Sequence, residues 1–299
     1  MAKALNKKKD YKKYSGRAQN YRNVYDKETG FMRPKKSNGE WKEPFDPFAA
    51  PTDFDKRDYT EANAWQYLWF VPHDVESLAD LMGGDKRFIA RLDTLFEVSS
   101  EVKEGGIPDM SGLIGQYVQG NEPDQQTPYL YNYVGAPWKT QNITSKIADS
   151  LYKDTPDGIP GNEDCGQMSS WYVMSAMGLY PVNPANGIYD FGSPVFDTAK
   201  IQLENRRNFL ITAKNLSDEN IYIQSVKLNG EEYNKIYITH EDIVDGGELE
   251  FTMGAKPNKN FGIDKGSFFH SEISKNQITT APYFEYKSSS FYDSVKIEI

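Results

Sequence analysis

The spacing of apolar residues changes once along this chain, and that change limits the folds open to it. Up to about Asn183 the apolar positions recur every three to four residues, which is the spacing of one face of an α-helix. Beyond Gly187 they alternate with polar residues, as in a strand with one buried face. The sequence therefore predicts an α+β protein with several domains: a helical domain over residues 1–186, a β-rich module over 187–262, and a linker with the start of a further β segment over 263–299.

The clearest predicted helix lies between Pro72 and Gly83. From Val75 onward apolar residues stand at i, i+3, i+4 and i+7, and Pro and Gly are common just before a helix start and just after a helix end. We expect the apolar face of this helix to pack inward. The same kind of spacing predicts further helices over residues 5–24, 60–70, 86–98, 127–134, 138–151 and 166–179.

Two further segments indicate how these elements pack. The helix predicted over 166–179 is apolar on almost every side, which predicts burial among other helices. After Lys200 the strand patterns repeat, and Asn229-Gly230 between two of them is a strong signal for a hairpin. We therefore expect residues 187–262 to form a small antiparallel β module.

The composition is that of a folded protein with an acidic body. Hydrophobic residues make up 38%, charged residues 26% and aromatic residues 14%, which excludes a disordered chain or a coiled coil. The net charge is −9 although Lys and Arg are concentrated near the start, so the remainder is unsuited to binding nucleic acid. No apolar run approaches the roughly 18 residues of a membrane span, and the start at Met1 lacks the apolar core of a signal peptide.

Several common catalytic and metal-binding patterns are absent from the sequence. It contains no G-x-S-x-G turn, P-loop, G-x-G-x-x-G motif or EF-hand loop. The single Cys165 excludes an intrachain disulfide. None of His73, His240 and His270 has a second His three or four residues away, so we expect no histidine-based zinc site. His73 is interpreted first as a structural hydrogen-bonding residue.

Three loops combine carboxylates and amides with nearby Trp and Tyr, over residues 59–67, 120–124 and 158–166. Any one of them is explained by helix capping, in which Thr60 or Asp164 would satisfy free backbone N–H groups. Three such loops separated by aromatic helices favour sugar chemistry instead. Glycoside hydrolysis requires one protonated acid at the leaving oxygen and one carboxylate that activates water or attacks the sugar.

The sequence resembles a known family in these same loops. The strings Glu61-Ala-Asn-Ala-Trp-Gln-Tyr, Gly120-Asn-Glu-Pro and Gly161-Asn-Glu-Asp-Cys-Gly-Gln-Met look like those of glycoside hydrolase family 92, the calcium-dependent exo-α-mannosidases. The resemblance runs from about Met1 to Gly262. It implies the C-terminal portion of an (α/α)6 barrel followed by the β module, and release of terminal α-mannose with inversion at the anomeric carbon, with α-1,2 linkages the common family substrate.

The resemblance also assigns roles to individual residues. It implies that Glu61 is the general acid, that Asp164 is the general base and that Glu163 assists the base. Calcium is implied as the cofactor, and oxygen donors of amides and carboxylates suit it. The implied calcium ligands are Gln66, Asn121 and Glu122. The residues expected to contact the mannose-containing glycan are Trp65, His73, Asp74, Trp138 and Lys139, with Trp171 equally expected in the core.

An inverting site has consequences for its two carboxyl groups. The acid must be protonated and the base ionised at the same pH, which predicts a raised pKa at Glu61 beside a normal or low one at Asp164. The two groups should lie roughly 6.5 to 9.5 Å apart, which leaves room for a water molecule.

The resemblance further implies that this chain corresponds to part of a longer protein. Family members carry an N-terminal β-sandwich and the first half of the barrel ahead of the matching region, and commonly an export signal. We therefore expect a parent that is secreted, periplasmic or on the cell surface. Two alternatives remain open: a fragment that binds mannose or glycan without hydrolysing it, and another (α/α)6 glycosidase or a phosphorylase.

Overall fold

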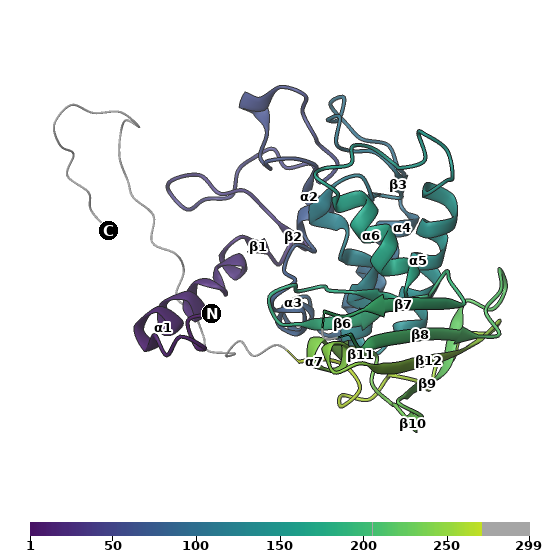
Figure 1. The fold of residues 1–299 in the computed structure, drawn as a ribbon. Coiled ribbons are helices and arrows are strands. Elements are labelled where there is room, and N and C mark those ends of the chain that lie inside the picture. The colour runs from purple at the N-terminus through teal and green to yellow at the C-terminus, as the bar shows by residue number, and fades with distance from the viewer. Residues whose placement is uncertain (205, 271–299) are drawn as a thin grey trace.

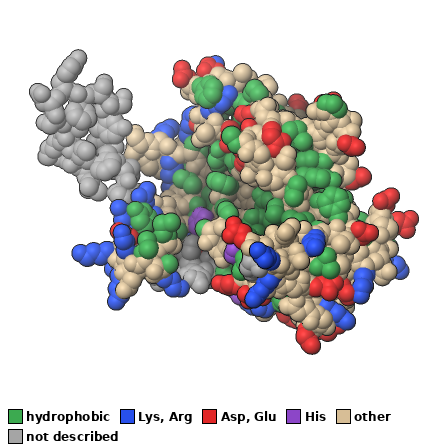
Figure 2. All heavy atoms as spheres, in the orientation of Figure 1, with side chains coloured by type: hydrophobic (Ala, Val, Ile, Leu, Met, Phe, Trp, Pro, Cys, Tyr) green, Lys and Arg blue, Asp and Glu red, His purple; other side chains and the backbone are tan. Residues whose placement is uncertain are grey.

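A computed structural model describes residues 1–204 and 206–270. A helical region and a five-stranded sheet lie side by side, and the first helix, α1 (Lys8–Arg17), lies apart from both (Figure 1). No residue of α1 is buried, and Figure 2 shows its basic side chains on the surface. The β segment expected near the C-terminus falls within residues 271–299, outside the described part of the chain.

The predicted helices are present, with shorter bounds at several places. The segment 60–70 is helical only over α2 (Ala64–Tyr67), because Asn63 caps the helix and leaves Glu61 and Ala62 ahead of it. Residues 127–134 form a 3₁₀ helix rather than an α-helix. The helical elements are α1, η1 (Asn20–Asn23), η2 (Phe54–Lys56), α2, α3 (Val75–Leu81), α4 (Asp85–Glu97), η3 (Glu122–Asp124), η4 (Thr127–Val134), α5 (Pro137–Leu151), α6 (Gln167–Ala176) and α7 (His240–Val244).

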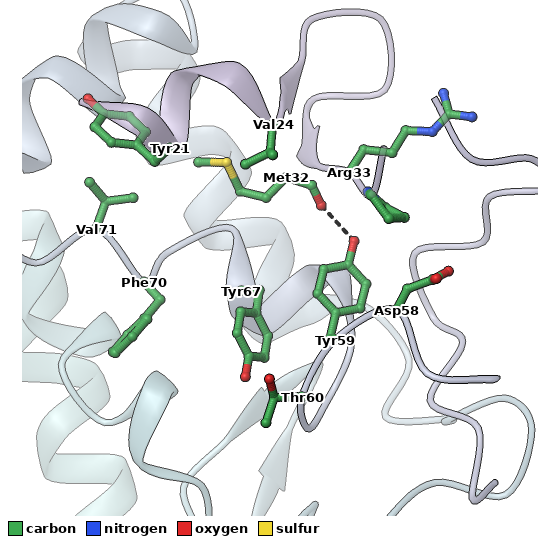
Figure 3. A pocket seen from close by; sticks show the side chains of 11 residues that line it. Tyr21, Val24, Met32, Arg33, Asp58, Tyr59, Thr60, Tyr67, Phe70 and Val71 are labelled. Atoms are coloured by element: carbon green, nitrogen blue, oxygen red, sulfur yellow. Dashed lines mark hydrogen bonds between the residues drawn. The ribbon is translucent and has the colours of Figure 1, made fainter. Parts of the chain in front are cut away.

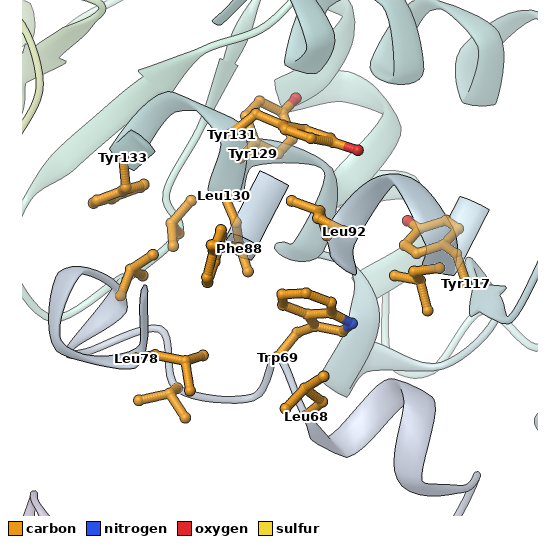
Figure 4. Close-up of a cluster of buried hydrophobic side chains, with 14 of the residues drawn as sticks. Leu68, Trp69, Leu78, Phe88, Leu92, Tyr117, Tyr129, Leu130, Tyr131 and Tyr133 are labelled. Carbon is orange, nitrogen blue, oxygen red and sulfur yellow. The ribbon is translucent and has the colours of Figure 1, made fainter. Parts of the chain in front are cut away.

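The core of the helical region lies between α2, α3, α4 and η4 (Figure 4). The ring of Trp69 meets that of Phe88 edge to face, with 5.2 Å between centroids, and both side chains are fully buried. Leu78 on α3 and Leu92 on α4 are equally buried. The inward-facing stripe predicted between Pro72 and Gly83 is therefore confirmed. None of the helices in the described residues is long and apolar enough to cross a membrane.

The burial predicted for the whole of residues 166–179 is wrong. Met168 and Trp171 on α6 are buried, but Val173 is 53% exposed and Ser169 and Ser170 face solvent. Only one side of α6 packs against neighbours among the described residues, and the apolar composition of the other side is not explained by those contacts.

The β-rich region holds a mixed sheet, so the expectation of an antiparallel module is wrong at one strand pair. The five strands run in the order β10-β9-β12-β8-β7, and β12 pairs parallel with β8. β12 lies between β8 and β9, which run in opposite directions, and a strand in that position must be parallel to one neighbour. Their bounds are β7 (Thr198–Gln202), β8 (Asn208–Lys214), β9 (Tyr222–Leu228), β10 (Glu231–Glu232) and β12 (Gly247–Gly254).

A three-stranded sheet links the helical and β-rich regions. Its order is β11 (Tyr237–Thr239), β6 (Ile188–Phe191) and β5 (Leu179–Tyr180), so β5, which follows α6, pairs with β6 of the β-rich region. The backbone N–H of Ile223 on β9 also donates to Oε1 of Gln141 on α5, at 3.0 Å. The remaining strands are β1 (Tyr25–Asp26), β2 (Phe31–Met32), β3 (Leu113–Ile114) and β4 (Tyr117–Val118).

Candidate active site

The first predicted loop ends in a capping box that fixes where Glu61 stands. The side chain of Asn63 accepts a hydrogen bond from the backbone N–H of Trp65 at 3.0 Å. In return, Oε1 of Gln66 accepts from the backbone N–H of Asn63 at 2.7 Å. Ala62 just before the cap is left-handed, with φ of 60°. The chain therefore turns sharply between Glu61 and the helix, and Glu61 is half-buried outside it.

Gln116 joins the first loop to the second. Nδ2 of Asn63 donates to Oε1 of Gln116 at 3.0 Å, and Nε2 of Gln66 donates to the backbone carbonyl of Gln116. All three side chains are fully buried. Because buried amides that are fully paired hold one geometry, these bonds fix the start of α2 against the segment that leads to Asn121 and Glu122.

The second and third loops pack backbone against backbone. Oγ of Ser111 donates to the carbonyl of Pro160 at 3.0 Å. A Cβ placed on Gly120 would lie 2.6 Å from that same carbonyl oxygen, so only glycine fits there. Farther along, Nε2 of Gln167 on α6 donates to Oε1 of Gln125 at 2.7 Å. The third loop at Pro160 and the start of α6 at Gln167 are thus each held beside the second loop.

The third loop has an unusual backbone at the predicted base. Asp164, Cys165 and Gly166 are all left-handed, with φ of 51°, 56° and 91°. Such conformations cost energy in residues with a Cβ and are concentrated at functional sites. Asp164 is exposed. Glu163 has a structural contact as well, because its Oε1 accepts from the backbone N–H of Ser169 in the first turn of α6, at 3.1 Å.

Charged groups of the second and third loops act on Glu61 in the first loop. Burial raises the pKa of Glu61, and the charges of Glu122, Asp109 and Asp164 raise it further, in that order. The predicted acid, a predicted calcium ligand and the predicted base therefore act on one another although they lie far apart in sequence. Within the described residues none of these four carboxylates forms an ion pair. The cluster is a concentration of negative charge that a cation or a proton would stabilise.

The predicted calcium ligands differ in whether their side chains already form hydrogen bonds within the protein. Both amide atoms of Asn121 are buried without a hydrogen-bond partner, and the next residue, Glu122, is exposed. An unpartnered buried amide is costly, which suits a residue that meets a ligand. Gln66 already uses both ends of its amide within the capping box and the bond to Gln116. Among the described residues no group of three or more His, Cys, Asp and Glu could hold a metal ion, but this ligand set has only one such residue.

Two of the predicted sugar contacts, Trp65 and Asp74, are almost fully buried. Trp65 is 4% exposed and its ring meets that of Phe31 edge to face, with 5.0 Å between centroids. Asp74 is 1% exposed, and its Oδ2 accepts from the hydroxyl of Tyr21 at 3.0 Å. Nε2 of His73 lies 2.7 Å from the carbonyl oxygen of Ala18. The contacts of His73 and Asp74 tie residues 18–21 to the segment before α3. The sugar-binding role of Trp65, His73 and Asp74 stays a prediction.

The other predicted contacts, Trp138 and Lys139, stand in the first turn of α5. Nζ of Lys139 forms an ion pair with Oδ1 of Asp93 on α4 at 2.8 Å. The hydroxyl of Tyr131 donates to that same oxygen at 2.9 Å. Trp138 is partly buried, and Nζ of Lys259 lies 6.0 Å from the centre of its ring. Trp171, in contrast, is buried and donates from Nε1 to the carbonyl of Gln125 at 3.0 Å, which favours its core interpretation.

A hollow of about 330 Å³ adjoins the first loop and is lined by Tyr59, Thr60 and Tyr67 (Figure 3). Tyr59 closes one side of it, and its hydroxyl donates to the carbonyl of Met32 at 2.6 Å. Burial together with the charge of Glu61 raises the pKa of Tyr67. The hollow is therefore a direct neighbour of the predicted acid.

Two residues of this arrangement were not singled out by the sequence. Gln116 belongs to no recognisable motif. Its partners Asn63 and Gln66 do, because their spacing is that of a capping box. Asp109 follows Pro108 in a turn ahead of the second loop, and an acidic residue in a Pro-containing turn is usually structural. Its position beside Glu61 is visible only in three dimensions.

Comparison with known proteins places the chain in a family of enzymes. The model of the glycosyl hydrolase family 92 catalytic domain matches residues 1–255. An uncharacterized secreted glycosidase from Arthroderma benhamiae is 33% identical over 271 residues, which cover 82% of this chain and 32% of the relative. The chain belongs to glycosyl hydrolase family 92.

Solved structures agree with this assignment. A family GH92 α-mannosidase from Bacteroides thetaiotaomicron, in complex with mannoimidazole, superposes with a TM-score of 0.84 at 38% identity, covering 96% of this chain and 38% of that one. A family GH92 inverting mannosidase from the same organism gives 0.79 at 38% identity, covering 90% and 37%. The fold is thus that of family 92 mannosidase structures, and the chain spans about a third of the length of these relatives.

Proposed function

We propose that this chain carries the acid, the base and calcium-binding residues of an exo-acting α-mannosidase that releases terminal mannose from α-1,2-linked glycans with inversion. The observation that carries the proposal is the raised pKa of Glu61 beside the charges of Glu122 and Asp164. One of the matching solved structures is described as an inverting mannosidase, which supports the stereochemistry.

The two catalytic carboxyls would act on opposite sides of the glycosidic bond. Glu61, half-buried and surrounded by negative charge, keeps its proton more readily than an exposed Glu and gives it to the leaving oxygen. Asp164, exposed on its left-handed turn, takes a proton from the water that attacks the anomeric carbon. Glu163, whose carboxylate also holds the first turn of α6, fixes the backbone on which Asp164 stands.

Calcium would be held by Asn121 and Glu122, whose amide and carboxylate oxygens are the donor types that it prefers. The unpartnered amide of Asn121 supports this assignment most directly. Gln66 is the remaining proposed ligand, and its oxygen would bind metal in addition to the backbone N–H of Asn63. When bound at these residues, calcium would supply positive charge that binds sugar hydroxyls and favours distortion of the ring.

Membership of the family also supports a proposal about the wider architecture. We propose that α2 to α6 form part of an (α/α)6 barrel, and that the rest of that barrel and a β-sandwich belong to sequence beyond these 299 residues. Because a related glycosidase is described as secreted, we propose secretion for the parent protein as well.

The first test is release of mannose from α-1,2-mannobiose, with calcium and with a chelator, while the anomer formed is followed by NMR. We expect β-mannose, with loss of activity on chelation and recovery when calcium is returned. Calcium should also raise the melting temperature of the chain, which provides a readout independent of turnover. Binding of mannose without hydrolysis by a folded chain would favour the glycan-binding fragment instead.

A further inference from the structure

Asp109 stands in a short turn that two backbone hydrogen bonds close. The N–H of Met110 donates to the carbonyl of Ile107 at 3.0 Å, and the N–H of Ser111 donates to the carbonyl of Asp109, also at 3.0 Å. Aspartates in turns commonly accept a backbone N–H two residues on. Here, within residues 1–204 and 206–270, the Asp109 carboxylate forms no hydrogen bond and no ion pair. The turn therefore does not depend on this side chain.

The turn is fixed against the loop of the proposed acid. Ile107 and Met110 belong to a small hydrophobic cluster that also contains Ala62 and Val118, all four of them buried. Asp109 lies between the first two, and Glu61 directly precedes Ala62. The two carboxylates are thus carried by segments that share one core, and each is half-buried at its edge.

The same turn is fixed against the loop of the proposed base. Ser111, two residues after Asp109, donates to the carbonyl of Pro160, and a Cβ on Gly112 would lie 2.7 Å from Cβ of Pro160. Asp109 therefore stands where the first and third loops meet, and its charge acts on Glu61. The buried, unpartnered amide of Asn121 belongs to the same junction and indicates independently that a ligand fills it.

We propose that Asp109 is a further substrate-binding residue, whose carboxylate accepts a hydrogen bond from a hydroxyl of the sugar held between Glu61 and Asp164. The inference rests on the proposed function. A rigid backbone turn, a carboxylate without a protein partner and proximity to the proposed acid are together what a fixed acceptor for a sugar hydroxyl requires.

The test compares the isosteric variant Asp109→Asn with the wild-type chain on 4-nitrophenyl α-mannoside and on its 2-, 3-, 4- and 6-deoxy analogues. A charge-assisted hydrogen bond predicts a fall in kcat/KM of roughly tenfold to hundredfold, mainly through KM. For the one analogue that lacks the bound hydroxyl, the two proteins should have equal kcat/KM. A merely structural role would lower all five values alike. Asp109→Ser provides a second truncation, and Asp154→Asn, an exposed aspartate ahead of the third loop, is the matched control.

The possible outcomes distinguish failure of the role proposed for Asp109 from failure of the proposed mannosidase function. An active wild type with an unchanged Asp109→Asn variant, or with the same penalty on every analogue, overturns the role of Asp109 and leaves the mannosidase assignment intact. A folded wild type that neither hydrolyses the substrates nor binds methyl α-mannoside in calorimetry with calcium present overturns both.

Discussion

The five-stranded sheet and the three-loop site differ in whether their polar and charged groups have partners within the protein. In the sheet, Leu249 and Phe251 on β12 are fully buried, and the backbone of β12 pairs with β8 on one side and β9 on the other. At the site, four carboxylates converge without an ion pair among the described residues, and Asp164 adopts a left-handed backbone. Unpaired groups held in fixed positions destabilise a fold unless a ligand uses them. The comparison therefore assigns stability to the sheet and chemistry to the loops.

The largest expected effect comes from removing the proposed acid. Glu61→Gln keeps the size of the side chain but cannot donate a proton as a carboxylic acid does, so kcat on α-1,2-mannobiose should fall by roughly 10²- to 10⁴-fold. The melting temperature should stay equal or rise slightly, because the substitution removes one charge from a repulsive cluster. Glu219→Gln, at an exposed glutamate of the β-rich region, should change neither quantity. Retained activity in Glu61→Gln would remove Glu61 from the mechanism.

The sheet should show the reverse response. Phe251 on β12 is fully buried, and its ring meets that of Phe191 edge to face with 5.1 Å between centroids. Phe251→Ala should lower the free energy of unfolding by about 3–5 kcal/mol, because it leaves a cavity in the core. The folded fraction should keep its kcat. Thr252→Ala, at the half-buried next residue of the strand, is the control in urea unfolding. A changed kcat in the folded Phe251 variant would mean that sheet and site are coupled.

The sequence predicts the sheet and the site to different depths. Local spacing is enough for the helix between Pro72 and Gly83, because its apolar face is set by residues within one short segment. The parallel pairing of β12 with β8 is not local, since it depends on a strand entering between two others far apart in the chain. Asp109 was missed for the same reason: it matters through a hydrophobic cluster shared with Ala62, which no spacing in the sequence reveals.

The ligand chemistry implied by the resemblance stays a prediction, whereas the contacts of several implied residues can be read from the structure. Motif resemblance placed Glu61, Glu122 and Asp164 together, and their mutual electrostatic effect agrees with that expectation. It could not predict that Trp65 lies in the core or that Lys139 pairs with Asp93, because burial and ion pairing are set by neighbouring elements. The distance expected between the acid and base carboxyls stays a prediction.

The smallest expected effect concerns Asp190, a buried acid of the scaffold that lies outside the site. Asp190 on β6 accepts a hydrogen bond from the hydroxyl of Tyr133 at 2.9 Å, and burial raises its pKa to about 7. The folded state therefore holds a proton that the unfolded state releases near pH 4, so this group stabilises the fold at low pH. That contribution is lost as the pH rises from about 4 to about 7 and is constant above that range.

Asp190→Asn resembles the protonated side chain at every pH, so it should flatten the pH dependence of stability. Between pH 4 and 7 the wild type should lose the contribution of Asp190 to its free energy of unfolding, and the variant should not. The decrease over this range should therefore be smaller in the variant by roughly 2–4 kcal/mol, as measured by urea unfolding at each pH. The exposed Asp154→Asn control should keep the wild-type slope. An unchanged slope in Asp190→Asn would show that Asp190 is ionised in the folded protein. Ionised carboxylates without an ion pair would then occur in the scaffold as well as at the site, and the division between the two regions would not hold.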